Sequence, residues 1–472
     1  MLDGYHRYSF GCCRWLLLAA EEKADTRKRG KGMNKDDYIL ISTDDHVSEP
    51  PDVFVGRVPA KYVDDAPYVE RTPEGWDRWV YNDHVIPNVG LNAVAGRPPD
   101  EYGMEPTSFD EMRDGCWDVH ERVKDMSANG VLAGLNFPSF PRFAGQIFLE
   151  SASKDAEMSL AMVRAYNDWH LEGWAGAYPD RFVPMGILPI WDPELCAAEV
   201  RRLAERGCHA ISFTCNPYDL GLPSLHTHHW DPMLAVCEEV NTVVCMHLGS
   251  NSKAPMTSPD APFTVQIVGT AIPLFHTATD LVWSHVCRDF PDIKFALSEG
   301  GIGWVPYWLE RADYTYTHHK AWSGLDFGGQ MPSDIFKRNI MTCYIDDKQG
   351  VENIDKMNAD LVTWECDFPH SDSTWPESPE ALENHFRGVD DAIVNKITHE
   401  NVMKWFSFDP YPIRPRAKCT VGALRAEVPD HDISPVSVAE RKTRPKARTF
   451  GDVIEHMSSW SDGGSFLRAG TT

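Results

Sequence analysis

The sequence lacks an apolar run long enough to span a membrane. Near the N-terminus, the apolar stretch from Trp15 to Ala20 is short and is followed by a polar, basic segment, whereas a transmembrane helix needs roughly 20 apolar residues. This stretch also lacks the basic start and the cleavage site of a secretory signal. We therefore expect no membrane partner, and we interpret residues 1–35 as a disordered extension or a non-native start.

Positive charge is scarce, and no long Lys/Arg run lies beyond residue 32. The 472 residues include 45 Lys and Arg against 70 Asp and Glu, a formal net charge of -25. Such a balance disfavours nucleic acids and anionic membranes as ligands. The expected partner is a small-molecule substrate.

Closely spaced cysteines are also missing. The 12 cysteines are scattered apart from Cys12-Cys13, and no two have CxxC spacing. Most fall within the apolar stretches described below, as reduced core thiols do. The sequence therefore indicates no disulfide framework and predicts a cytoplasmic protein.

The sequence does contain a regular alternation of short β-branched runs and longer helical stretches. About eight such runs occur, the number that a closed α/β barrel requires. The runs cover residues 38–42, 131–137, 182–188, 210–214, 242–247, 293–298, 340–345 and 361–365. The helical stretches cover residues 108–129, 152–178, 192–206, 232–239, 272–290, 304–316, 353–357, 378–385 and 390–406. The sequence predicts a TIM-like (β/α)8 barrel over residues 36–410.

Two regions interrupt this alternation. Residues 50–107 are rich in Pro, Gly and aromatic residues and lie between the first strand and the first helix. In a barrel this position is on the catalytic face, so we expect a lid or a small β-hairpin insertion. Residues 411–472 are irregular and are expected to form a tail that wraps the barrel or a neighbouring subunit. Together the two regions suggest a homodimer.

Ionisable residues follow several of the predicted strands. The C-terminal ends of parallel strands converge on one face of a barrel, so side chains at these ends should meet. Asp44 and His46 are two apart and therefore point to the same side of the first strand. The remaining members are His247, Glu299, Asp367 and, just past Pro369, His370. Two His and two or three carboxylates suit a divalent cation, with zinc, manganese and iron all acceptable.

These strand ends resemble those of a known family. Asp44-Asp45-His46 ends the first strand, His247 ends the fifth, and the segment WECDFPHSDSTWP places Asp367 at the eighth. From residue 38 to about 408 the sequence resembles the amidohydrolase superfamily, specifically its amidohydrolase-2 branch. That branch includes aminocarboxymuconate semialdehyde decarboxylase and related aromatic acid decarboxylases. The resemblance implies that the metal ligands are Asp44, His46, His247 and Asp367, with Asp44 in place of the first His of the branch's HxH pair.

The sequence departs from the branch at two further points. Decarboxylases of the branch often have a SHGG-like pattern at the sixth strand, whereas this chain has Ser298-Glu299-Gly300-Gly301. Glu299 is therefore expected to be an additional metal ligand or the acid/base. No Lys occurs between Lys154 and Lys253, which excludes the carboxylated Lys that bridges two metals in many superfamily members. We expect one divalent ion, with zinc favoured over manganese or iron, and a second ion at Glu299 and His370 stays open.

Other residues have weaker signals. Arg142 is a candidate carboxylate clamp and Trp304 a candidate pocket residue, although packing of a helix explains the aromatic residue equally well. Asp45 should point away from the pocket, because side chains alternate along a strand. The segment His226-Thr227-His228-His229 is metal-like in composition, but its position before Asp231-Pro232 favours a helix N-terminus.

These residues predict a metal-dependent hydrolase or a nonoxidative decarboxylase that acts on a small carboxylated or aromatic substrate. The reaction would use a metal-activated water or a metal-bound carboxylate, with Asp367, Glu299 and His370 as catalytic groups. Two alternatives stay open. One is an oxygenase-like enzyme with two iron or manganese ions on the same barrel, and the other is a catalytically silent subunit of a hetero-oligomer.

Overall fold

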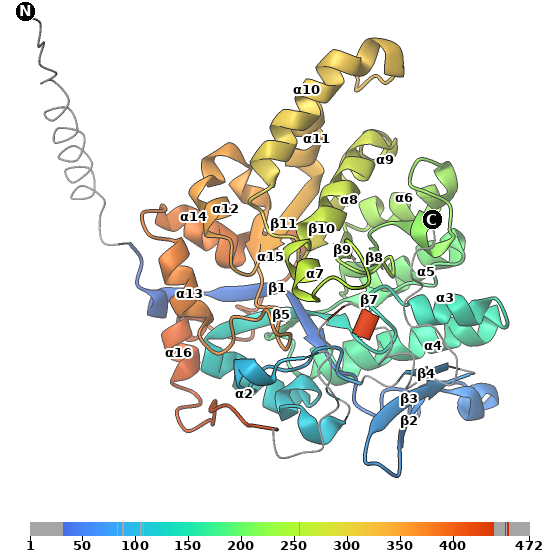
Figure 1. The fold of residues 1–472 in the computed structure, drawn as a ribbon, viewed down its shortest axis with the longest axis vertical. Helices are drawn as coiled ribbons and strands as arrows, with labels where there is room; N and C mark the ends of the chain where they lie inside the picture. The colour runs from blue at the N-terminus through green and yellow to red at the C-terminus, as the bar shows by residue number, and fades with distance from the viewer. Residues whose placement is uncertain are drawn as a thin grey trace, which may run out of the picture.

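A computed structural model of the chain describes residues 32–438, except 83, 87–88, 104–105, 107 and 254, together with 449, 451 and 452. The predicted extension over residues 1–35 therefore lies mostly outside the described residues. A parallel β barrel occupies the centre of the described part, with helices around it (Figure 1). No described helix combines the length and the apolar character that a membrane crossing needs.

The barrel strands follow the predicted runs closely. They are β1 (Leu40–Val47), β5 (Val131–Pro138), β6 (Phe182–Val183), β7 (Gly186–Ile187), β8 (Ala210–Thr214), β9 (Val243–His247), β10 (Lys294–Ser298), β11 (Ile340–Tyr344) and β12 (Val362–Trp364). All their pairings are parallel, in the orders β1-β5-β6 and β7-β8-β9-β10-β11-β12. The third predicted run is divided into β6 and β7, two short strands separated by Pro184 and Met185.

The first and last strands close the barrel through hydrogen bonds near their ends. The backbone N–H of Asp367 donates to the carbonyl oxygen of Asp44 at 2.8 Å, and that of His46 donates to Phe368 at 2.7 Å. The hydroxyl groups of Thr43 and Thr363 are 3.0 Å apart. The predicted α/β barrel is thereby confirmed, and its closure places Asp44 and His46 beside Asp367.

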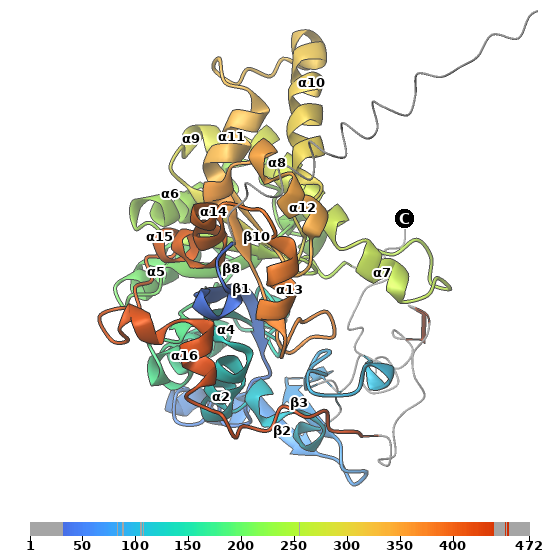
Figure 2. The same cartoon turned by 90° about the vertical axis from the view of Figure 1, so that its left-hand side faces the viewer.

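The helices surround this barrel. They are α2 (Val119–Asn129), α3 (Gln146–Ala152), α4 (Ala156–Trp169), α5 (Pro193–Ala204), α6 (Asp231–Glu239), α7 (Thr264–Val268), α8 (Ala271–Trp283), α9 (Val286–Asp289), α10 (Val305–Ser323), α11 (Pro332–Asn339), α12 (Lys348–Glu352), α13 (Ser378–His385), α14 (Asp391–Asn395), α15 (Asn401–Trp405) and α16 (Val421–Arg425). Two π-helical turns follow α4 and α14, at His170–Trp174 and Lys396–Glu400. The upper part of α10 stands clear of the barrel in both views (Figure 1, Figure 2).

Several helix predictions were wrong in extent. The helix predicted over residues 353–357 lies earlier, as α12, and only a 3-10 turn at Ile354–Lys356 follows it. The helix predicted from residue 108 begins only at Val119, because the Asp118 carboxylate caps it by accepting from the N–H groups of His120 and Glu121. The residues before it form short 3-10 turns instead. No helix was predicted between residues 316 and 340, yet α10 continues to Ser323 and α11 follows with Pro332 in its first turn.

The core has an inner and an outer layer, and the strands supply both by alternation. In β9, Val243 and Cys245 belong to the inner cluster, whereas Val244 and Met246 belong to the cluster between strands and helices. His247 continues the inner series, because residues two apart along a strand share a face. The alternation of β9 therefore directs this imidazole toward the barrel axis at the C-terminal end.

The insertion after β1 contains a three-stranded antiparallel sheet of β2 (Tyr68–Arg71), β3 (Asp77–Tyr81) and β4 (His84–Ile86). The buried ring of Trp79 stacks on Phe140, with ring centroids 4.3 Å apart, in the loop after β5. The N–H groups of Val94 and Ala95 donate to the carbonyl oxygen of Pro369 after β12. The insertion thus rests on loops at the C-terminal end of the barrel, where the predicted site lies.

The described part of the tail lies along the barrel and the insertion. Helix α16 contacts α2 and β5, and Arg425 forms hydrogen bonds of 2.8 and 2.9 Å to Glu380 in α13. Farther along, the N–H of Val436 donates to Gly96 in the insertion at 2.7 Å. The described part of the tail therefore contacts helices α2 and α13 at one end and the insertion at the other.

Candidate metal centre

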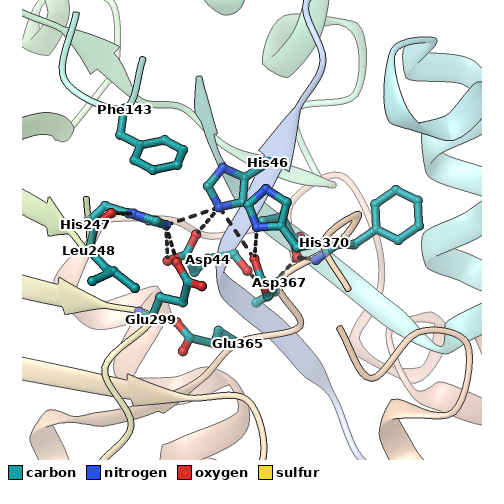
Figure 3. Close-up of polar contacts among 12 residues, drawn as sticks. Asp44, His46, Phe143, His247, Leu248, Glu299, Glu365, Asp367 and His370 are labelled. Carbon is teal, nitrogen blue, oxygen red and sulfur yellow. Dashed lines mark hydrogen bonds and ion pairs between the residues drawn. The ribbon is translucent and has the colours of Figure 1, made fainter. Parts of the chain in front are cut away.

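Side chains from four strand ends meet at the C-terminal end of the barrel. They are Asp44 and His46 of β1, His247 of β9, Glu299 directly after β10, and Asp367 and His370 after β12 (Figure 3). Asp44, His247 and Asp367 are fully buried, His46 is 1% exposed, and Glu299 is 17% exposed. Each of these residues was singled out from the sequence.

The donor atoms of this group are spaced as the ligands of one cation would be. The Nε2 atoms of His46 and His247 are 3.2 Å apart. Oδ1 of Asp44 is 3.4 Å from Nε2 of His46, and its Oδ2 is 3.4 Å from Nε2 of His247. Oδ1 of Asp367 is 3.5 Å from Nε2 of His46. Two ligands held at about 2.1 Å from one ion are roughly 3.0–3.4 Å apart. The spacing therefore fits a divalent cation between these four side chains.

The carboxylates of this group also lack the partners that buried charges need. Neither oxygen of Asp44 nor Oδ2 of Asp367 accepts a hydrogen bond from a described residue. Burial raises the pKa of both carboxyl groups well above the usual range, and nearby Glu365 raises that of Asp44 further. Because an unpaired buried carboxylate is costly, a bound cation is the natural compensation.

Both imidazoles are suited to be neutral ligands. Burial lowers the pKa of His247 to about 3 and that of His46 well below its usual value. Nδ1 of His247 faces the carbonyl oxygen of Leu248, which places the proton on Nδ1 and the lone pair on Nε2. The ring of Phe143 lies 4.2 Å from His247 and 5.1 Å from His46 between centroids, so it covers both imidazoles.

Glu299 joins this group from a strained backbone position. Its φ angle is 66°, a left-handed conformation that is unfavourable for a residue with a side chain. The N–H of Glu299 donates to Oε2 of Glu365 at 3.2 Å, and the indole N–H of Trp304 reaches the carbonyl oxygens of Gly300 and Gly301 at 3.0 Å. These contacts hold the loop so that Oε2 of Glu299 lies 3.2 Å from Nε2 of His247.

Trp304 therefore supports the loop that carries Glu299, and its ring contacts Phe275 and Phe336. These contacts fit the packing alternative considered for this residue. Its predicted role in substrate binding stays a prediction.

Glu365 belongs to the same buried group, although the sequence analysis did not single it out. It is fully buried, accepts hydrogen bonds from the N–H of Glu299 and the thiol of Cys343, and burial raises its pKa to about 8. The signal was present, because Glu365 precedes Asp367 by two positions at the end of the eighth predicted strand. Residues with this spacing share a face of a strand.

The side chain of Asp45, which lies between Asp44 and His46 in β1, points away from the metal centre. Its Oδ1 accepts hydrogen bonds from Ser42 Oγ at 3.0 Å and from the N–H of Phe368 at 3.1 Å. Burial raises its pKa to about 7, against the opposing effect of the Arg122 guanidinium. Asp45 thus contributes to the junction of β1 with the loop after β12.

His370 lies on the other side of His46. Its Nδ1 is 2.9 Å from Oδ1 of Asp367, and its ring lies over that of His46 with centroids 3.9 Å apart. Two overlapping groups, Asp44-His46-His247 and His46-Asp367-His370, each offer ligand atoms within 4.8 Å of one another. The described residues therefore accommodate one ion and leave a second ion open.

Arg142 is found in the loop after β5, next to Phe143. It lines a cavity of about 770 Å³ together with Gln146, Tyr218 and other residues, and its Nη1 is 3.3 Å from Oε1 of Glu150. Gln146 donates to the carbonyl oxygen of Ser250 at 2.8 Å, and Ser250 Oγ donates to that of His247 at 2.6 Å. This cavity therefore borders the segment that carries His247.

Glu49, the last acidic residue of the first strand end, has a structural role. Its carboxylate accepts hydrogen bonds from the N–H groups of Ser139 and Phe140 at 2.9 and 2.7 Å and from the Tyr166 hydroxyl at 2.9 Å. Burial raises its pKa to about 7, although these donors oppose the shift. Glu49 thus ties the end of β1 to the loop that carries Arg142 and Phe143.

We expect His247→Ala to lose the bound divalent ion, because it removes one of two nitrogen ligands from a carboxylate-rich site. The loss of affinity should exceed the roughly 10–100-fold typical of removing an outer hydrogen-bond partner. Metal per chain is measured by mass spectrometry after dialysis, with His318→Ala on exposed α10 as the control. A His247→Ala protein that keeps the wild-type metal content would contradict this ligand set.

Glu49 predicts a defined pH dependence of stability. Its folded pKa of about 7 lies above the unfolded value of about 4.3, so the folded protein binds the proton more tightly. That stabilisation is complete below about pH 4 and is lost as the pH rises through 7. Between pH 5 and 7, the wild type should lose about 1 kcal/mol of unfolding free energy per pH unit relative to Glu49→Gln. Urea unfolding of both metal-saturated proteins measures this, and parallel curves throughout that range would refute it.

Comparisons with known proteins bear on the family and the fold. The Amidohydrolase family model (Amidohydro_2) matches residues 58–408. This range begins after β1, so the assignment of Asp44 and His46 to the site depends on their position in the structure and not on the family match. An amidohydrolase from Mycobacterium avium subsp. paratuberculosis K-10 is similar in structure, with a TM-score of 0.60, 19% identity, and coverage of 78% of this chain and 99% of that one.

Two solved decarboxylases are also similar. One is 5-carboxyvanillate decarboxylase from Novosphingobium aromaticivorans DSM 12444, complexed with manganese and 4-hydroxy-3-methoxy-5-nitrobenzoic acid (TM-score 0.55, 18% identity, 80% of this chain and 100% of that one). The other is 2,6-dihydroxybenzoate decarboxylase from Rhizobium (TM-score 0.50, 17% identity, 78% and 98%). At these identities the likeness concerns the fold, whereas the family match covers most of the chain. The chain therefore belongs to the amidohydrolase family.

Proposed function

We propose that this protein is a metal-dependent, nonoxidative decarboxylase of a small aromatic carboxylate. The observation that carries the proposal is the position of Glu299, an acid 3.2 Å from a metal-binding nitrogen of His247. Its side chain is 17% exposed, whereas those of Asp44 and Asp367 are fully buried. Glu299 is therefore the acid of this group that borders the space open to a substrate.

Four residues of the centre would bind the ion, and a fifth would donate a proton. Asp44, His46, His247 and Asp367 would hold the ion, which when bound supplies a Lewis acid for the oxygens of the substrate. Glu299, in its protonated form, would donate its proton to the ring carbon that bears the carboxylate. The bond from that carbon to the carboxylate then breaks, its electron pair returns to the ring, and CO2 leaves. Water afterwards reprotonates Glu299.

Hydrolysis is the second candidate, and the pairing of Asp367 with His370 favours it. With Oδ1 2.9 Å from Nδ1 of His370, Asp367 could accept a proton from an attacking water and pass it to a leaving group. A lactone or an amide would then be the substrate. This reaction needs Asp367 as a base, whereas decarboxylation needs Glu299 as an acid. Because Asp367 would also hold the ion in both reactions, the Glu299 variant and the product released separate the candidates.

The identity of the ion is part of this proposal. Zinc is the ion that the sequence favours, and manganese is the ion in one similar decarboxylase. Nitrogen and carboxylate ligands together accept either ion. Two redox-active ions per chain would favour the oxygenase-like alternative, and the absence of any tightly bound ion in the purified protein would favour the silent subunit.

We predict that the protein loaded with manganese or zinc releases CO2 from hydroxylated benzoates, including 5-carboxyvanillate and 2,6-dihydroxybenzoate. Asp367→Ala should abolish turnover, whereas Glu299→Gln should keep the metal and lower kcat by about 10²–10⁴-fold. Mass spectrometry of CO2 measures the rate, and Glu157→Gln, an exposed substitution, serves as the control.

Three results would contradict this prediction. They are the failure of both metal forms to release CO2 from any acid of the panel, retention of the full rate by Glu299→Gln, and normal turnover by Asp367→Ala. Ring opening of a lactone without CO2 release would instead support the hydrolytic candidate.

We also propose that Arg142 binds an anionic group of the substrate. It is 15% exposed in the cavity next to the His247 segment, and guanidinium groups bind carboxylates with two parallel hydrogen bonds. Its neighbour Phe143 covers the two imidazoles. A substrate held by Arg142 would therefore lie close to the metal-binding residues.

Arg142→Gln should raise KM by roughly 10–100-fold with little change in kcat, because a charged hydrogen bond to the bound substrate is lost in ground and transition states alike. Steady-state kinetics measures the split. Glu150→Gln, which removes the partner of Arg142 but keeps the cation, is the matched control and should not raise KM. An unchanged KM in Arg142→Gln would remove this residue from the substrate site.

Assembly and location stay predictions. A homodimer was expected from the insertion and the tail, and a cytoplasmic location from the cysteines. The ten described cysteines are all free and buried, as expected of reduced core thiols.

A further inference from the structure

The histidine-rich segment at residues 226–229 does not act as a unit. His226 pairs with Asp280 in α8, and the ring of His229 lies edge-on to Trp230. His228 instead lies against His285, with ring centroids 4.1 Å apart. The sequence analysis favoured a helix N-terminus here, and α6 does begin at Asp231. The partner of His228, however, comes from a segment more than fifty residues later.

His228, His285 and Asp289 form a group with metal-ligand spacing. Each of the three offers one ligand atom within 4.8 Å of those of the other two. His285 precedes α9 and Asp289 ends it, a separation of four residues that places both side chains on the same side of a helical turn. Helices α6 and α9 are neighbours on the outside of the barrel in both views (Figure 1, Figure 2).

Asp231 orients both imidazoles of this group. Its Oδ2 is 2.7 Å from Nδ1 of His228, and its Oδ1 is 2.8 Å from Nε2 of His285. A carboxylate that accepts the proton of one ring nitrogen fixes the tautomer and leaves the lone pair on the other nitrogen. This is the usual arrangement around metal-binding histidines. Because Asp231 engages one ring nitrogen of each histidine, Nε2 of His228 and Nδ1 of His285 are the nitrogens left to act as ligand atoms.

The backbone that carries these residues is well anchored. Trp230 is fully buried, and its indole N–H donates to the carbonyl oxygen of Pro223 at 2.7 Å. On the other side, Val286 and Cys287 of α9 are fully buried. The His285 side chain is 15% exposed and that of His228 is 72% exposed. An ion could therefore enter from solvent onto a rigid frame.

We propose that His228, His285 and Asp289 form a second divalent-cation site, on the outer wall of the barrel, with Asp231 as the positioning residue. Two imidazoles and one carboxylate suit a borderline ion such as zinc, and three protein ligands leave one position for water. The site is separate from the centre inside the barrel and shares no residue with it. Its ion would link the start of α6 to α9 and so stabilise the folded state.

The test counts zinc ions on the full-length protein. After equilibration with a graded excess of zinc and removal of free metal, the double variant His228→Ala/His285→Ala should hold one ion fewer per chain than the wild type. The difference does not depend on how many ions the inner centre binds. Asp231→Asn keeps all three ligands and should weaken binding at this site by about 10–100-fold.

Matched controls separate a metal site from a simple ion-pair network. His226→Ala changes an exposed histidine of the same segment that pairs with Asp280, and it should retain the full zinc content. Turnover at the inner centre should be unchanged in the double variant. Equal zinc content in the wild type and the double variant across the range, or the same loss in His226→Ala, would overturn the proposal.

Discussion

The structure depends on the accumulation of buried carboxylates at the C-terminal end of the barrel. Asp44, Asp367 and Glu365 are fully buried, and the Glu299 side chain beside them is 17% exposed. Burial raises the pKa of each, and in every case a neighbouring carboxylate raises it further. Such a group is tolerated only where positive charge, protons or hydrogen-bond donors compensate it. Two neutral imidazoles cannot supply that compensation, and a divalent cation can.

The barrel explains how these groups come together. The side chains project from the ends of four strands, β1, β9, β10 and β12. The alternation of inner and outer residues, as in Val243, Cys245 and His247, directs such side chains inward. Backbone hydrogen bonds between the ends of β1 and β12 fix the remaining pair, Asp44 and Asp367. Around this frame, loops adjust the site, with Glu49 holding the loop of Phe143 and Glu365 holding the loop of Glu299.

Much of this arrangement follows from the sequence, because strand alternation is a local property. The eight runs located the barrel strands, and the spacing of Asp44 and His46 indicated a shared face. Glu365 was missed because it was taken as the end of a strand, although its spacing to Asp367 carried the signal. His285 and Asp289, which lie close to His228 in the fold, had no local signal, since they follow it by more than fifty residues. The extent of α10 and α11 was missed because few apolar residues mark these helices.

The closure of the barrel at β1 and β12 has a consequence for the order of assembly. The proposed ligands Asp44 and His46 lie near the beginning of the barrel sequence and Asp367 lies near its end, so a growing chain contains the whole set only after most of the barrel has been synthesised. An ion captured early by β1 alone would have only two of its ligands. Loading of the inner centre must therefore follow synthesis of nearly the entire barrel, whereas His228, His285 and Asp289 are available much sooner.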